Sequence, residues 1–149
     1  MTLKDSLSAD LRQARKSGDK VRMTVLRLVV AGIKNAEIDK RATLDDSGVI
    51  EVLSREAKQH RESIDEFAKG NRQDLVDSNE KELAILMEYL PEQMSREDIE
   101  ALARQVMEQV GASGPADKGK LMGQLMPQLK GKADGKEVNE VVTELLAGG

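Results

Sequence analysis

Apolar residues recur along the chain at the three- and four-residue spacing of helices that bury one face. The first two predicted helices have their core positions at Leu3, Leu7, Leu11 and Ala14, and then at Val21, Val25, Leu28, Val29, Gly32, Ile33 and Ala36. The second set is wide for one face, which predicts that this helix lies at the centre of a bundle. Two more apolar patterns follow before Pro91, and three shorter ones follow after it.

Residues that start and stop helices divide these patterns. Glycines are expected at the ends of helices, and Ser or Asp at their starts, where a side-chain oxygen accepts from the first free N–H groups. A connection at residues 39–46 separates the second and third helices. The expected boundary residues are Gly18, Asp19, Gly70, Pro91, Ser95, and Asp134, which forms a capping box with Glu137.

The prediction is therefore an all-α chain: a four-helix N-terminal domain at residues 1–92, joined by a short hinge to a small three-helix domain at residues 93–149. Composition agrees, because the chain is rich in good helix formers. Phe67 and Tyr89 are its only aromatic residues, whereas all-β domains rely on aromatic and β-branched side chains.

The chain has no cysteine, which excludes a disulfide framework, a thiolate metal site and a cysteine nucleophile. Its first residues are charged and do not form a signal peptide. The longest apolar run, Leu28–Ala31, is far shorter than the roughly 20 residues that span a membrane. These features lead us to expect a cytoplasmic protein without a membrane partner.

Residues suited to catalysis are sparse. His60 is the only histidine, and its neighbours Lys58, Arg61 and Glu62 predict a solvated surface position. One histidine cannot form the usual zinc cluster, and no phosphate-binding glycine loop follows a strand. We therefore expect no catalytic residue, no cofactor and no metal site.

Charge is unevenly distributed. The formal net charge of −4 and the pI of about 5.2 argue against indiscriminate binding to nucleic acid. Between residues 118 and 136, however, five lysines accompany only one acidic residue, Asp134. The five are Lys118, Lys120, Lys130, Lys132 and Lys136.

Glycines lie close to these lysines. Gly131 and Gly135 flank the start of the last predicted helix, where free N–H groups and the helix dipole attract anions. Lys130, Lys132 and Lys136 cluster at the same place. Two interpretations remain open: a corner that binds phosphate, or an ordinary helix–helix turn with solvated lysines.

Several strings in a fixed order give the chain a family resemblance. They are residues 14–20 (ARKSGDK), 26–28 (LRL), 33–38 (IKNAEI), 58–64 (KQHRESI), 89–95 (YLPEQMS), 119–123 (GKLMG) and 129–135 (LKGKADG). On these strings the chain is identified as a member of the YqeY family over essentially its whole length. The family more often has arginine where this chain has His60, which further weakens a catalytic role for that residue.

The resemblance implies a helical N-terminal domain and a C-terminal domain similar to the tail of the B subunit of the tRNA-dependent Asp/Glu amidotransferase. A similar domain is attached to some glutaminyl-tRNA synthetases. In the amidotransferase the tail helps to hold tRNA, and the chemistry lies elsewhere. The resemblance thus implies a tRNA-associated accessory module, and any label of carbon–nitrogen ligase activity would be inherited from the complex. The candidate nucleic-acid-binding residues are Lys118, Lys120, Lys130, Gly131, Lys132 and Lys136.

Two other functions remain as alternatives. The first is a protein adaptor that docks on an amidotransferase or an aminoacyl-tRNA synthetase and does not touch RNA. The second is a stand-alone amidotransferase, which the missing nucleotide motif and nucleophile disfavour.

Overall fold

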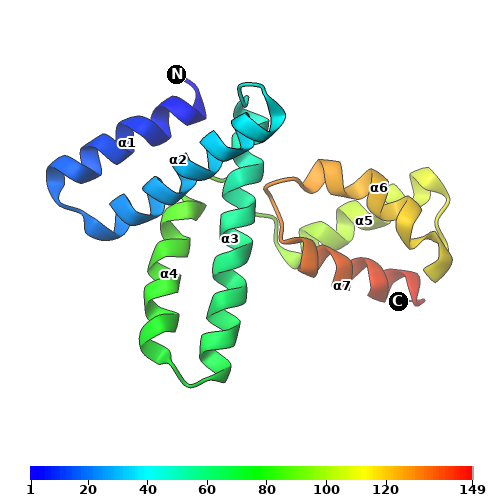
Figure 1. The fold of residues 1–149 in the computed structure, drawn as a ribbon. Helices are drawn as coiled ribbons and strands as arrows, with labels where there is room; N and C mark the ends of the chain where they lie inside the picture. Colours follow the sequence, from blue (N-terminus) through cyan, green and yellow to red (C-terminus); the bar gives the residue numbers. More distant parts are fainter. Residues whose placement is uncertain (149) are drawn as a thin grey trace. The chain divides into compact units, whose positions relative to one another are not determined.

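The computed structural model describes residues 1–148, which contain seven α-helices and no strand (Figure 1). The helices are α1 (Leu3–Ser17), α2 (Lys20–Lys40), α3 (Asp46–Lys69), α4 (Gln73–Met87), α5 (Arg96–Val110), α6 (Lys118–Leu129) and α7 (Gly135–Leu146). A single 3-10 turn, Pro115–Asp117, precedes α6. The prediction of an all-α chain is confirmed.

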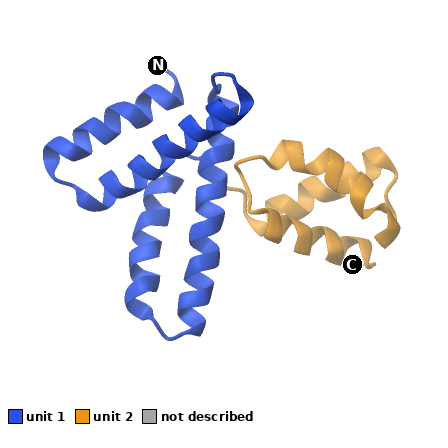
Figure 2. Ribbon diagram, viewed as in Figure 1, with its two compact units in different colours: residues 1–90 blue, residues 91–149 orange. Residues whose placement is uncertain are grey.

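The chain divides into two compact units, Met1–Leu90 (unit 1) and Pro91–Gly149 (unit 2), coloured separately in Figure 2. The division lies two residues before the boundary expected from the sequence. Unit 1 holds the first four helices, and unit 2 holds the last three.

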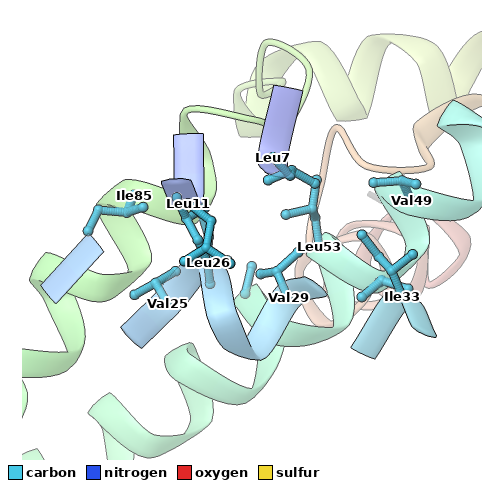
Figure 3. Close-up of a cluster of buried hydrophobic side chains, with 12 residues drawn as sticks. Leu7, Leu11, Val25, Leu26, Val29, Ile33, Val49, Leu53 and Ile85 are labelled. Carbon is cyan, nitrogen blue, oxygen red and sulfur yellow. The ribbon is translucent and has the colours of Figure 1, made fainter. Parts of the chain in front are cut away.

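Unit 1 consists of two helical hairpins, α1–α2 and α3–α4, packed on each other (Figure 1). Its core takes side chains from all four helices, which point toward one another in Figure 3. They include Leu7, Leu11, Val25, Leu26, Val29, Ile33, Val49, Leu53 and Ile85. Both α2 and α3 contact the other three helices, so the expected central place of α2 holds.

The predicted core face of α2 is too wide, however. Val21 and Leu28 are 43% and 53% exposed, whereas Val25, Val29 and Ile33 are buried. A core of two crossed hairpins covers only one side of α2, so the apolar residues on its other side face solvent.

Unit 2 has its own core, which packs α5, α6 and α7 together. Its fully buried side chains are Ile99, Ala103, Leu121, Leu125, Leu129, Val138 and Val142. Three evenly spaced leucines of α6 enter this core, so one face of α6 is fixed inward and the opposite face is exposed.

The helix boundaries follow local chemistry. Gly18 and Gly111 end α1 and α5 in the left-handed conformation, at φ 75° and 70°, as glycine allows. Ser95 accepts the Asp98 N–H at the start of α5. The start of α7 differs from the expected capping box, because the Asp134 carboxylate accepts from the Lys136 N–H, two residues on, in an Asx-type turn.

Candidate functional site

The five predicted lysines lie at the two ends of α6. Lys118 and Lys120 are in its first turn, and Lys130 and Lys132 directly follow its last residue. Lys136 is in the first turn of α7. Since α6 has 12 residues, the two groups are separated by about 18 Å along its axis. The structure therefore splits the predicted cluster into two.

The helix between the two groups, α6, carries no acidic residue. Every other α-helix in residues 1–148 carries at least one. The exposed positions of α6 are Gly119, Lys120, Gly123, Gln124, Pro127 and Gln128. This surface, which we call the α6 face, is neutral in its middle and positive at its ends.

The turn after α6 is held firmly at its backbone. Gly131 takes the left-handed conformation, at φ 75°. The Gly131 carbonyl accepts from the Gln93 amide at 2.7 Å, and the Lys132 carbonyl accepts from the Met94 N–H at 2.9 Å. Leu129, directly before the turn, is fully buried. Lys130 and Lys132 therefore extend from a fixed backbone.

Two of the main-chain amides at this turn are already occupied within the chain. The Lys132 N–H donates to the Leu129 carbonyl at 2.9 Å, and the Lys136 N–H donates to the Asp134 carboxylate at 3.3 Å. The Asp134 charge thus lies at the start of α7, where an anion would compete with it.

The ammonium groups of Lys118, Lys120, Lys132 and Lys136 form no ion pair with the described residues. Lys120 lies near Asp117, but that carboxylate is already occupied. It accepts the Ser113 and Gly114 N–H groups, which hold the pKa of Asp117 below its ordinary value, with a smaller contribution from Lys120.

Acidic residues also lie near the other end of α6. Lys132 lines a shallow depression of about 350 Å³ together with Glu92 and Asp98. Their charges lower the positive potential on that side of Lys132.

His60 is not the solvated residue that its neighbours in the sequence suggest. Its side chain is only 11% exposed. The Nδ1 atom lies 2.8 Å from the Glu56 carbonyl oxygen, and the Nε2 atom lies 3.1 Å from the Glu82 carboxylate. The imidazole therefore links α3 to α4. The prediction of a solvated position for His60 was wrong, because its partner Glu82 is distant in the sequence.

A polar cluster closes unit 1 beyond the end of α4. The Tyr89 hydroxyl donates to the Asp10 carboxylate at 2.6 Å, and Arg22 donates to Glu88 at 2.8 Å. Burial, and then the hydrogen bond to Asp10, raise the pKa of Tyr89 to about 12. These groups satisfy one another, so the cluster ties α1 and α2 to the segment after α4. Nothing in the local sequence around Tyr89 indicates this long-range pairing.

No three His, Cys, Asp or Glu side chains in residues 1–148 are grouped so that they could hold a metal ion. None of the helices described has both the length and the apolar character needed to cross a membrane.

Comparison with known proteins gives a family match over residues 4–146, described as "Yqey-like protein". Relatives named "Altered inheritance of mitochondria protein 41, mitochondrial" include one from Lachancea thermotolerans, 34% identical over 74% of this chain and 61% of its own length. The Kluyveromyces lactis relative is 36% identical over 74% of this chain and 62% of its length. The Pyrenophora tritici-repentis relative is 29% identical over 94% of this chain and 78% of its own length.

The chain thus spans about three fifths of the length of the first two relatives. Their name describes neither an enzymatic activity nor a nucleic acid.

The expected cytoplasmic location is wrong, because these relatives are named as mitochondrial proteins. That expectation rested on the lack of an apolar signal segment. Such a lack does not distinguish the cytoplasm from mitochondria, since mitochondrial targeting segments are amphipathic and basic rather than apolar.

Proposed function

The chain belongs to the family of Yqey-like proteins, and from that premise we propose that it is a tRNA-associated accessory module that holds RNA along the α6 face. In this proposal the chain binds RNA and does not itself transform it. The resemblance of unit 2 to the tail of the tRNA-dependent amidotransferase supports tRNA as the class of RNA.

The α6 face is the observation that carries the proposal. A helix without acidic residues, with lysines at both ends, offers a surface on which phosphates meet cations without repulsion from the helix itself. The two lysine groups are separated by about 18 Å, a distance that several nucleotides of one strand can cover.

The middle of the α6 face favours a close approach. A Cβ atom added at Gly119 or Gly123 would meet nothing within 4 Å, and both positions face solvent. Without side chains there, an RNA backbone can approach the helix between the two lysine groups.

Recognition through the RNA backbone fits the composition of unit 2. Phe67 and Tyr89, the only aromatic residues, both belong to unit 1, so unit 2 offers no ring on which a base can stack. RNA is then recognised by shape and charge rather than by base sequence.

The test is a titration of tRNA with the full chain at several salt concentrations. Two double variants, Lys118→Ala/Lys120→Ala and Lys132→Ala/Lys136→Ala, each remove two lysines from one end of α6. Each is expected to weaken binding and to reduce the slope of log affinity against log salt by about 2. The control Lys81→Ala/Arg104→Ala changes net charge equally, at exposed positions on α4 and α5, and should leave both quantities unchanged.

An affinity that neither double variant changes, or that the control changes equally, contradicts the proposal. The net charge of −4 favours a second candidate, an adaptor that docks on an amidotransferase or an aminoacyl-tRNA synthetase without RNA contact. Co-purification with the synthetase or amidotransferase after ribonuclease treatment distinguishes the two, because only a direct protein contact survives it.

A further inference from the structure

The solvent-facing side of α2 carries an unpartnered apolar stripe. Its exposed positions at helical spacing are Val21, Thr24, Leu28, Ala31, Asn35 and Ile38, which we call the α2 stripe. Four large apolar side chains in residues 1–148 are strongly exposed, and three of them are Val21, Leu28 and Ile38 of this stripe. Isolated exposed apolar residues are ordinary, but a row of them on one helix marks a contact surface.

The spacing of the α2 stripe is that of helices that pair with another helix. Residues 21, 28 and 35 are seven apart, and so are residues 24, 31 and 38. These are the two core positions of a heptad, which keep facing the same partner along a helix. The stripe is about 26 Å long, enough to contact a partner helix of about 18 residues. Asn35 is the kind of polar core residue that fixes the register of such a pair.

A row of four basic residues follows one edge of the stripe. Lys20, Arg27 and Lys34 lie on α2, each seven residues from the next, and Arg41, the residue that caps the end of α2, lines the same depression as Lys34; we call these four the cation row. All four side chains are exposed, and none forms an ion pair or a side-chain hydrogen bond with the described residues. In paired helices this flanking position is where charges select the partner.

Nearby acidic residues do not neutralise the cation row. Glu37 is occupied, since it accepts from the Lys4 ammonium at 2.7 Å and from the Leu44 N–H at 2.9 Å. These hydrogen bonds, that from Lys4 first, lower the pKa of Glu37. Asp19 accepts from the Arg22 N–H as the cap of α2. Asp39 follows the opposite edge of the stripe, so the row keeps its charge.

The end of the stripe has a place for an anchoring side chain. A shallow depression of about 440 Å³ is lined by Lys34, Ile38 and Arg41, with Glu37, Ala42 and Thr43 completing it. Ile38 is 72% exposed beside it. An apolar side chain seated there would have two cations of the row as neighbours.

We propose that the α2 stripe and the cation row bind an amphipathic helix of another protein, with acidic residues placed opposite the cations. A second copy of this chain is disfavoured, because antiparallel pairing of two α2 helices would oppose one cation row to another. Nucleic acid is disfavoured, because the centre of the surface is apolar and has no aromatic residue. This surface lies in unit 1 and is independent of the RNA proposal for unit 2.

The probe is a synthetic helical peptide of about 20 residues, with leucine at its heptad core positions and glutamate at its flanking positions. One matched peptide replaces every glutamate with lysine, and another replaces every leucine with serine. Binding to the full chain is measured by fluorescence anisotropy. We expect both matched peptides to bind at least about tenfold more weakly than the glutamate–leucine peptide.

Charge exchange makes the test specific. Arg27→Glu/Lys34→Glu should reverse the preference, so that the lysine–leucine peptide binds better than the glutamate–leucine peptide. Leu28→Ser/Ile38→Ser should lose binding to both. The control Lys69→Glu/Lys81→Glu places the same charge change on α3 and α4 and should behave as the unchanged chain. Thermal melts check the fold of each variant, which should be retained because all of these side chains are exposed.

Three outcomes would overturn the proposal. The first is that no peptide binds, or that the glutamate–serine peptide binds as well as the glutamate–leucine peptide, since charge alone would then act. The second is competition by tRNA that is lost in Arg27→Glu/Lys34→Glu, which would assign the cation row to RNA. The third is self-association in sedimentation that Leu28→Ser/Ile38→Ser abolishes, which would assign the stripe to a second copy.

Discussion

His60 joins α3 to α4 through its Nε2 atom, which contacts Glu82, whereas its Nδ1 atom contacts the Glu56 carbonyl oxygen of its own helix. Both partner oxygens only accept hydrogen bonds. The charged neighbours of His60 are visible in the sequence. The position of Glu82 opposite His60 is not, because it follows from the turn of the α3–α4 hairpin.

Tyr89 gives a prediction at the residue scale. Its pKa is raised from 10.0 to about 12 by burial and by the hydrogen bond to Asp10. The neutral phenol therefore stabilises unit 1 fully below about pH 10, and this contribution is lost as the pH rises toward 12. Tyr89 is the only tyrosine and the chain has no tryptophan, so phenolate absorbance reports it alone.

We expect an absorbance midpoint near pH 12 in the folded chain and near pH 10 in denaturant. The stability of Tyr89→Phe, followed by circular dichroism, should fall less over the same range than that of the unchanged chain. A folded-state midpoint near pH 10 would show that the phenol is neither shielded nor bonded as described.

Helix boundaries are the elements that local sequence predicts best. Gly18, Asp19 and Ser95 act within three residues of themselves, so their roles need no knowledge of the fold. The orientation of α2 is harder, because it has apolar residues on two sides. The packing of the two hairpins buries Val25 and Ile33. The apolar periodicity of α2 alone does not indicate which of its two apolar sides is buried.

Two glycines in unit 2 should respond in opposite ways to alanine. Gly111 has φ 70°, so Gly111→Ala should cost about 1 kcal/mol of stability through left-handed strain. Gly123 lies in α6 with nothing within 4 Å of an added Cβ, so Gly123→Ala should stabilise by up to about 1 kcal/mol. Urea unfolding followed by circular dichroism measures both changes.

The same Gly123→Ala protein should bind tRNA more weakly in the titration described above, because the added methyl group stands on the α6 face. Unchanged RNA affinity in the stabilised protein would show that RNA does not contact the middle of the α6 face. It would leave the contacts proposed for the lysines untouched.

At the scale of the whole molecule, closeness in sequence was a poor guide to closeness in space. Lys118 and Lys136 are 18 positions apart, and together with the lysines between them they look like one basic cluster. Because α6 runs for 12 residues between the two groups, it holds them at opposite ends. The number of helices and the place of the hinge could be predicted from the apolar periodicity and the helix-ending residues, both of which are local features of the sequence.

Separate cores predict separate unfolding. Leu125 is fully buried in unit 2, so Leu125→Ala should cost that unit about 2–5 kcal/mol. Helix loss by circular dichroism should then begin at a lower temperature, whereas the Tyr89 absorbance change, which reports unit 1, should keep its midpoint. The exposed neighbour gives the control Gln124→Ala, which should change neither signal. A common downward shift of both signals would mean that the units unfold together.

The hydrogen bonds from Gln93 and Met94 to the turn after α6 have a mechanical consequence. These two residues follow Pro91, where the chain enters unit 2, by two and three positions. A pull on this entry segment therefore acts directly on the loop that bears Lys130 and Lys132, as well as on the core of unit 2 through Met94. The position of the loop and a load on the linker are thus coupled by two short hydrogen bonds.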